Sequence, residues 1–282
     1  MLKPTRFLSI LLCCLFLVSS SIVLSDENAV TGRTILEKHH DAVITVKLVI
    51  KQGVSYGGRD TNKRESKTET TGTVIDPSGL TVISLFATDP TSLYSNMVSG
   101  GDEDMQLKFE SEVSDVKLVM PDGTEIAAKI ILRDKDLDLA YVRPTDKPGK
   151  AFKFADLTKA SKPQILDEVF VVNRLGKVAN RTNSISIDRI EAIVSKPRTF
   201  YIPGQNGQGG LGAPVFSANG QIIGVVLLRT IKSDGGSDIG SMLSSGLSGM
   251  GILPVILPAE VILEGAKQAP DIDPAPKEDK KE

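Results

Sequence analysis

Cysteine is nearly absent from this chain of 282 residues. The only two, Cys13 and Cys14, lie within the first 25 residues. Removal of that segment leaves a protein without cysteine, which excludes a structural disulfide, a thiolate nucleophile and a zinc site built on cysteine. Neither cysteine follows the small residue that a lipoprotein signal needs, so lipid attachment is not expected.

Histidine is just as scarce. His39 and His40 are neighbours, and no histidine occurs from Asp41 to Glu282. Adjacent residues on a helix point about 100° apart, so the pair is poorly placed to hold one metal ion. We expect no metal site and no cofactor, and we interpret both histidines as solvated residues ahead of the first strand. Imidazole, the commonest general base in proteins, is therefore missing from most of the chain.

An excess of positive charge is also missing. The chain has 33 basic and 35 acidic residues and a net charge of −2. Without Lys3 and Arg6, which lie in the first 25 residues, the net charge is about −4. A nucleic-acid partner therefore has no electrostatic support, and we expect none.

The first 25 residues have the composition of a secretory signal peptide. Lys3 and Arg6 supply a positive start, residues 7–18 form a nearly continuous apolar run, and Val23 and Ser25 are small enough to precede a cleavage site. The alternative is an uncleaved anchor, but the apolar run is shorter than the roughly 20 residues that span a membrane. We expect cleavage, export to the periplasm or the extracellular space, and membrane attachment only if the leader is retained.

Short segments rich in β-branched and apolar residues recur along the rest of the chain. Turn-forming Asp-Pro-Ser-Gly, Pro-Asp-Gly and Ala-Asn-Gly sequences separate some of them. Many short strands at near-regular spacing predict an all-β barrel or sandwich. The expected strands are residues 42–51, 72–75, 80–86, 116–120, 126–132, 139–142, 168–172, 184–194, 200–202, 213–216 and 221–228.

Three other segments depart from this pattern. Residues 257–267 predict a closing helix with a proline near its start. Residues 52–71 and 88–114 are mostly polar, and we interpret both as tolerated surface loops, with a binding role as the alternative.

Two groups of residues resemble exported serine proteases of the Deg/HtrA-like kind. The sequence TGTVIDPSG at residues 71–79 is similar to a family segment whose last glycine precedes the catalytic histidine by seven residues, which places Phe86 at that position. MPDGTE at 120–125 and RDKDLDLA at 133–140 resemble a family hairpin and its Asp-Leu-Ala motif. This match places Asp138 at the position of the catalytic aspartate.

The second half of the chain continues the resemblance. GQGGLGAPVF at residues 207–216 is similar to the nucleophile loop Gly-Asn-Ser-Gly-Gly-Pro-Leu, and the serine position falls on Leu211. NGQIIGV at 219–225 resembles the strand after that loop, and GMGILP at 249–254 resembles the Gly-Ile-Gly-Phe-Ala-Ile-Pro that precedes a helix. The order and spacing of these motifs match the family, and the resemblance as a whole covers about residues 36–268.

The resemblance implies an all-β, trypsin-like fold, a double six-stranded β-barrel with a C-terminal closing helix. No PDZ domain is expected after the helix, unlike in a typical Deg/HtrA protein. The expected organisation is a signal peptide at 1–25, a lead-in at 26–36, a first barrel at 37–146, a second barrel with the helix at 147–268 and a disordered tail at 269–282.

The catalytic triad that the resemblance implies is degenerate. Phenylalanine cannot act as a general base and leucine cannot act as a nucleophile. With Phe86 and Leu211 at these positions, the triad cannot hydrolyse a peptide bond. Losing the serine or the histidine of a triad costs about 10⁶ in rate. Asp138 is the one member retained, and we expect backbone amides or hydroxyls to hold it for structural reasons.

The glycine-rich loop invites two interpretations. A phosphate loop is disfavoured, because no Gly-Lys-Ser/Thr follows and a strand rather than a helix comes next. Gly209, Gly210 and Leu211 instead fit the form of an inherited oxyanion hole, made apolar by the leucine.

Two functions follow from these residues. The first is a pseudoprotease that binds a peptide or protein along a strand edge, with regulation or scaffolding of an active protease relative as one such role. If the site is filled, a structural role with interaction through the two polar segments replaces it. The second is an active endopeptidase with non-standard catalytic residues, for which Ser84 and Ser217 lie nearest in sequence without a plausible base.

Overall fold

The first barrel is built from the N-terminal half of the chain. The computed structural model describes residues 20–56, 59–60, 64–89, 107–204, 210–230 and 252–271. The sheet order is β2-β1-β3-β4-β7-β6-β5, and β5 pairs back onto β1, which closes six strands and leaves β2 as an appendage. The strands are β1 (Val43–Tyr56), β2 (Arg59–Asp60), β3 (Arg64–Val74), β4 (Thr81–Ser84), β5 (Leu107–Val119), β6 (Glu125–Asp134) and β7 (Leu139–Pro144).

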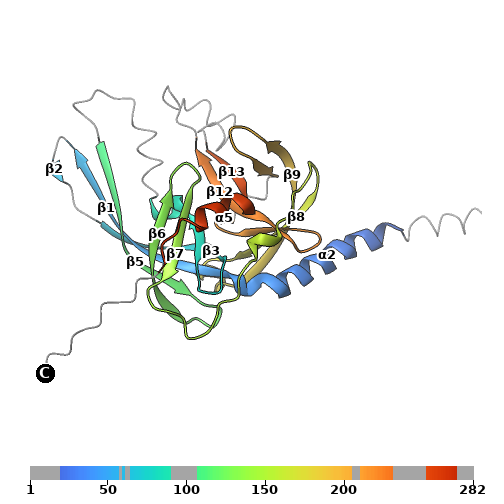
Figure 1. Ribbon diagram of the computed structural model, residues 1–282, viewed down its shortest axis with the longest axis horizontal. Helices are drawn as coiled ribbons and strands as arrows, with labels where there is room; N and C mark the ends of the chain where they lie inside the picture. Colours follow the sequence, from blue (N-terminus) through green and yellow to red (C-terminus); the bar gives the residue numbers. More distant parts are fainter. Residues whose placement is uncertain are drawn as a thin grey trace, which may run out of the picture.

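The second barrel closes in the order β10-β13-β12-β11-β8-β9. The helix α5 (Ala259–Ala266) follows its last strand directly (Figure 1). The predicted fold, two six-stranded antiparallel barrels with a C-terminal helix, is therefore confirmed. The strands are β8 (Glu168–Arg174), β9 (Asn183–Val194), β10 (Phe200–Pro203), β11 (Pro214–Ser217), β12 (Ile222–Thr230) and β13 (Ile252–Pro258).

Alternation along β1 explains why it forms a barrel wall. Ile44, Val46, Leu48 and Ile50 are all fully buried, whereas the lysines between and after them reach the outer face. Successive side chains of a strand point to opposite faces, so this pattern puts one apolar row inside the barrel. The strand therefore has an aliphatic inner face, and its lysines lie on the other face.

An apolar layer joins the two barrels. One cluster of buried side chains combines Leu139 and Tyr141 of β7 with Phe170 of β8 and Phe216 of β11. α5 packs on the same layer, and the Tyr141 hydroxyl donates a hydrogen bond to the Ile262 carbonyl at 2.7 Å. The two barrels share this core, and the layer fixes how the strands at the cleft meet.

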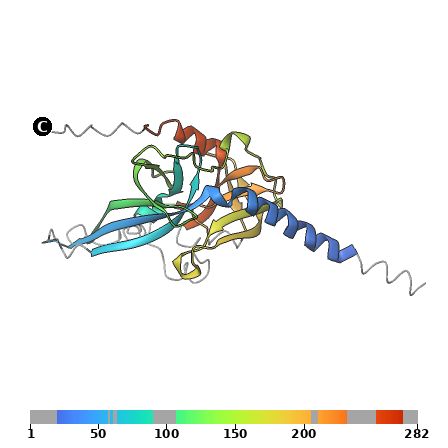
Figure 2. The ribbon, with the colours of Figure 1, turned by 90° about the horizontal axis from the view of Figure 1, so that it is seen from below.

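The helix α2 (Ser20–His39) precedes the first barrel and projects away from the molecule at its N-terminal end (Figure 2). It runs through the expected cleavage position at residue 25 without a break. From Asn28 onward the helix lies on the second barrel, and Asn28 donates a hydrogen bond to Glu168 at 2.8 Å. Within the described part of the chain, no helix has both the length and the apolar character needed to cross a membrane.

The prediction of surface loops at residues 52–71 and 88–114 is wrong where strands continue. β3 already begins at Arg64 and β5 at Leu107, and both pair with β1 to form a ribbon that extends beyond the barrel (Figures 1 and 2). Most side chains on this ribbon are exposed or half-buried. No apolar alternation is required where both faces meet water, so the sequence carried no strand signal there. Residues 57–58, 61–63 and 90–106 of these segments lie outside the described residues.

Three smaller differences concern one strand that was not predicted and the bounds of two other elements. β13 was not predicted, because Pro254 and Pro258 read as turn or helix-start signals. The strand expected at 80–86 ends at Ser84, where the 3₁₀ turn η2 (Leu85–Thr88) begins. The closing helix starts two residues later than expected, after Pro258. Two further 3₁₀ turns of the second half are η4 (Leu157–Lys159) and η5 (Lys177–Ala179), and η1 (His40–Ala42) precedes β1.

Candidate functional site

Asp138 occupies the turn between β6 and β7, at the junction of the two barrels. Its backbone has a φ of 55°, a left-handed conformation that aspartate adopts more readily than most residues. Its carboxylate accepts hydrogen bonds from the Ser84 hydroxyl at 2.6 Å, the Phe86 amide at 2.8 Å and the Leu228 amide at 2.8 Å. Leu228 lies on β12, so one carboxylate ties the first barrel to the second.

The environment of this carboxylate makes its charged form less favourable than in a solvated aspartate. Burial raises the pKa of Asp138 to about 6, while the hydrogen bonds from Ser84, Leu228 and Phe86 oppose the rise. Desolvation therefore raises the pKa by more than the three hydrogen bonds lower it. All three donors are groups of this chain, a hydroxyl and two backbone amides.

The nearest serines are already engaged in structural contacts. Ser84 is fully buried, and its hydroxyl donates to Asp138. Ser217 lies at the turn between β11 and β12, where its hydroxyl donates to the Gln221 carbonyl at 3.3 Å. A buried hydroxyl cannot reach a substrate, so Ser84 in particular offers no replacement nucleophile.

Phe86 lies in η2 rather than on the strand that the sequence predicted. Its side chain is half-buried, and its backbone amide donates a hydrogen bond to the Asp138 carboxylate. The position matched to the catalytic histidine thus lies directly beside the aspartate. A benzyl side chain there has no atom that can accept a proton.

The glycine-rich loop docks its main chain on the first barrel. Gly212 has a φ of 86°, its amide donates to the Val226 carbonyl at 2.7 Å, and its carbonyl accepts from the Thr73 hydroxyl at 2.7 Å. A Cβ atom at Gly212 would stand 2.1 Å from the carbonyl oxygen of Thr71, so only glycine permits this approach. Gly209, expected in the oxyanion loop, lies outside the described residues; Gly210 is buried within the loop.

Leu211 borders a cavity between the barrels. Its half-buried side chain packs against the apolar interior of the second barrel. The cavity beside it measures about 330 Å³ and is lined by Thr45 and residues 69–71 of the first barrel and by residues 173–176 of the second. The position matched to the nucleophilic serine is thus apolar, next to a space that a side chain can enter.

The histidines differ from the solvated pair that the sequence suggested. The His39 ring stacks on Phe216 with ring centroids 4.1 Å apart, and burial together with Lys38 lowers its pKa. His40 does face solvent in part and contacts Asp41 at 3.3 Å. Among the described residues, neither histidine hydrogen bonds to a serine or threonine hydroxyl, and no three His, Cys, Asp or Glu side chains cluster as a metal site would require.

Polar contacts between the barrels were not anticipated from the sequence. The Thr71 hydroxyl donates to the Asn173 side chain at 2.8 Å. The buried Arg174 donates to the carbonyls of Arg181, Val43 and Pro121 at 3.1 to 3.4 Å, and burial lowers its pKa. The contacts of Thr71 with Asn173 and of Arg174 with Val43 and Pro121 join residues more than 50 positions apart, and no local spacing signals them.

Comparison with known proteins agrees with this architecture. Residues 70–225 match the family model described as the trypsin-like peptidase domain, a span that holds Phe86, Asp138 and Leu211. A relative from Rhizobium meliloti (strain 1021), described as a probable periplasmic serine endoprotease DegP-like, is 29% identical over 133 residues. That alignment covers 46% of this chain and 26% of the relative, so the chain spans about a quarter of the curated relative that it matches.

Among solved structures, the crystal structure of the MamO protease domain from Magnetospirillum magneticum (apo form) matches with a TM-score of 0.48 and 14% identity. The match covers 83% of this chain and 98% of that domain. The family model, by contrast, spans more than half of the 282 residues. The chain belongs to the trypsin-like peptidase domain family.

Proposed function

We propose that this protein is an exported pseudoprotease that holds an extended peptide or protein segment in its cleft without cleaving it. The observation that carries the proposal is the cavity of about 330 Å³ beside Leu211, open between the barrels at the position matched to the nucleophile. A filled site would have argued for a purely structural role. An open cavity instead has room for a side chain of a bound peptide.

A strand edge that is only partly covered supports the same proposal. β3 pairs with β1 from Arg64 to Thr73 on one side, but with β4 only at Thr73 and Val74 on the other. Among the described residues, no strand pairs with the outer side of β3 before Thr73; the glycine-rich loop contacts this edge at Thr71, and residues 69–71 line the cavity. An extended peptide can add to such an edge by main-chain hydrogen bonds while its side chains fill the neighbouring cavity.

The chemistry of the site supports binding over turnover. Phe86 and Leu211 replace the base and the nucleophile, and Asp138 has donors from its own chain in place of an imidazole. Removing serine and histidine together costs a subtilisin-type triad about 10⁶ in rate. Any residual rate from the glycine-rich loop would be too slow for use.

Location and partner follow as part of the proposal. The leader at residues 1–25 and the periplasmic relative favour export to the periplasm or the extracellular space. The partner is a peptide or a protein segment, which includes a segment of an active protease relative.

A cavity-filling variant tests the binding site. Fluorescein-labelled, reduced and carboxymethylated casein serves as an unfolded probe, read by anisotropy. Gly176 lines the cavity, and a side chain added there meets open space. We expect Gly176→Trp to weaken casein binding at least fivefold. Gly149→Trp, which also points into open space but outside the cavity, is the matched control and leaves binding unchanged.

The active-protease alternative is tested on the same samples. We expect no fluorophosphonate labelling and no casein fragments after overnight incubation, with an active trypsin-like protease as reference. Labelling or cleavage would replace the pseudoprotease proposal by the second one. Casein binding that Gly176→Trp leaves intact would remove the cavity from the proposal.

A further inference from the structure

A second cavity continues the cleft beyond Leu211. It measures about 570 Å³ and lies between the outer face of β1, β3 and β5 and the turn after β8. We call it the outer groove. Glu69 lines both this groove and the cavity beside Leu211. A chain bound in the first cavity and continuing along β3 therefore enters the outer groove.

The outer groove is positive in a chain that is acidic overall. Its wall holds three acidic side chains, Glu69, Asp115 and Glu125, while the whole protein has a net charge of −2. The basic side chains on the wall number five: Lys47, Lys67, Lys117, Lys177 and Arg181. The groove therefore has a local excess of two positive charges, whereas the whole chain has a net negative charge.

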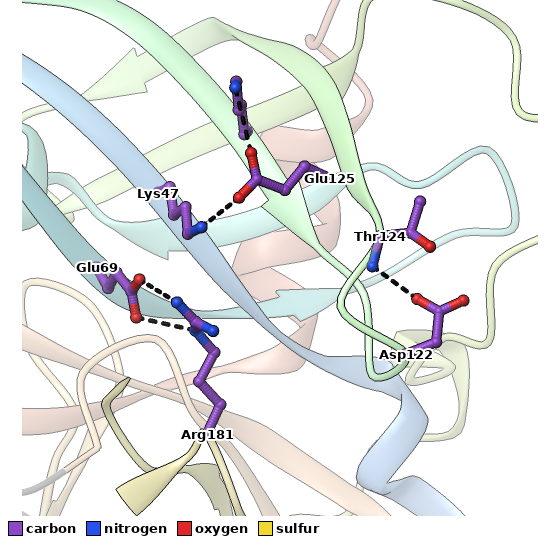
Figure 3. Close-up of polar contacts among 7 residues, drawn as sticks. Lys47, Glu69, Asp122, Thr124, Glu125 and Arg181 are labelled. Atoms are coloured by element: carbon purple, nitrogen blue, oxygen red, sulfur yellow. Dashed lines mark hydrogen bonds and ion pairs between the residues drawn. The ribbon is translucent and has the colours of Figure 1, made fainter. Parts of the chain in front are cut away.

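Pairing leaves two of these cations available. Glu125 contacts both Lys47 and Lys117, and Glu69 holds Arg181 through two bonds, with Nε to Oε2 at 3.0 Å (Figure 3). Arg181 lowers the pKa of Glu69, so this pair stays charged at neutral pH.

Lys67 and Lys177 have no such partner. Both are exposed, and within the described ranges neither forms an ion pair with a carboxylate, although Lys177 lies near enough to Glu69 to help lower its pKa. Asp115 lies on the far side of β1, since Val49 separates it from Lys67 across the sheet.

The turn that carries Lys177 is held over the groove by specific contacts. Asn180 and Arg181 have consecutive positive φ values of 51° and 53°. Left-handed backbone is unfavourable for most residues, arginine included, and persists where neighbours impose it. The Arg181 carbonyl accepts from Arg174, and its side chain is fixed by Glu69. Lys177 is therefore presented opposite β3 by a constrained turn.

We propose that the outer groove selects an acidic stretch of the bound peptide, whose carboxylates pair with Lys67 and Lys177. This inference rests on the proposed function. Lys67 lies four residues from Thr71 along β3, which corresponds to roughly 13 Å of strand. The acidic residues of the ligand accordingly lie about four positions from the residue that contacts Leu211.

Paired peptides test this selectivity. The probes are fluorescein-labelled twelve-residue peptides that carry Asp-Glu-Asp-Glu at one end, with Asn-Gln-Asn-Gln counterparts, each made in both orientations. In 50 mM salt we expect the acidic peptide of one orientation to bind about tenfold tighter than its amide counterpart. The preference falls in 500 mM salt, because exposed charges are then screened.

A double variant locates the effect. Lys67→Gln with Lys177→Gln is expected to reduce the acidic preference to less than threefold. Lys147→Gln with Lys150→Gln, which removes the same charge from exposed positions outside the groove, leaves it unchanged. Thermal unfolding checks that both double variants are folded.

The outcomes separate the two proposals. Equal binding of acidic and amide peptides overturns the groove assignment and leaves peptide binding in place. An acidic preference that survives Lys67→Gln with Lys177→Gln also overturns it, because recognition then lies elsewhere. Failure of every peptide to bind counts against both proposals.

Discussion

The turn that carries Asp138 and the glycine-rich loop that carries Leu211 contact the rest of the protein in different ways. Asp138 keeps its side chain, and its carboxylate bonds to both barrels. The loop keeps its main chain, with Gly212 pressed against Thr71, but its side chain at Leu211 has become apolar and packs toward the second barrel. In both regions the contacts with the rest of the protein are made by specific atoms: the carboxylate of Asp138 in the first, and the main chain around Gly212 in the second.

The difference suggests which parts of a protease site are structural. Under the proposed alignment, the imidazole and the hydroxyl that have no counterpart at Phe86 and Leu211 would act on substrate, whereas Asp138 and the loop main chain satisfy donors and acceptors of the protein itself. An unsatisfied buried polar group costs about 1–3 kcal/mol, so the kept atoms carry a stability cost if removed. The predictions below test this division, from the largest expected effect to the smallest.

Gly212→Ala should have the largest effect. Its Cβ would stand 2.1 Å from the Thr71 carbonyl oxygen at a φ of 86°, so backbone must move. We expect a loss of unfolding free energy above about 3 kcal/mol, measured by urea denaturation. Gly123→Ala is the matched control, with a φ of 88° and open space around its Cβ, and it should cost about 1 kcal/mol. Equal losses would show that the loop does not depend on its contact with β3.

Asp138→Ala should come second. The amides of Phe86 and Leu228 and the Ser84 hydroxyl lose their acceptor, and relief of the buried charge offsets part of that loss. We expect a decrease of about 2 kcal/mol in unfolding free energy at neutral pH. Asp136→Ala, on the exposed part of the same turn, should change stability by less than about 0.5 kcal/mol. A neutral Asp138→Ala would contradict a structural reason for keeping the aspartate.

Thr73→Val should have a smaller effect on the nucleophile loop. The fully buried Thr73 hydroxyl donates to the Gly212 carbonyl at 2.7 Å, and valine keeps the shape while removing the donor. We expect a loss of about 1 kcal/mol in the same denaturation assay. Thr68→Val, on the half-buried part of β3, is the control and should be near neutral. A loss as large as that of Gly212→Ala would mean that the hydroxyl, not the backbone approach, holds the loop.

The pH dependence from Asp138 should be the most gradual effect. Its pKa is about 6 in the folded protein, above the ordinary value of 3.8, so the folded state binds more protons than the unfolded state between these values. The contribution of this group is therefore fully present below about pH 4 and declines as pH rises through 6. The measurement is the unfolding free energy of the protein minus that of Asp138→Asn from pH 4 to pH 8. A difference that grows with pH would reverse the sign argued here.

Much of the fold was accessible from the sequence, and the reason is periodicity. The apolar alternation of β1 marks a barrel wall, because buried side chains must repeat every second residue. The polar parts of β3 and β5 gave no such signal, since strands that meet water on both faces need no alternation. β13 was missed because its prolines resemble turn signals.

The candidate site was accessible only in part. The match that places Phe86, Asp138 and Leu211 depends on motif order along the chain. The donors to Asp138, the cavity beside Leu211 and the outer groove depend on residues 50 to over 100 positions apart. His39 shows the same limit, because its stacking on Phe216 follows from how α2 meets the second barrel.

The sequence by itself determined that no imidazole follows residue 40 and that no cysteine follows residue 14, because side-chain chemistry is a property of composition. It also determined the strand-rich pattern and the acidic net charge. Only the tertiary structure decided that Asp138 is held by both barrels, that Leu211 borders a cavity and that the outer groove beyond it has two lysines without an ion pair among the described residues. Burial, hydrogen-bond satisfaction and local electrostatic excess arise from contacts between distant segments, and these exist only once the two barrels have closed and docked.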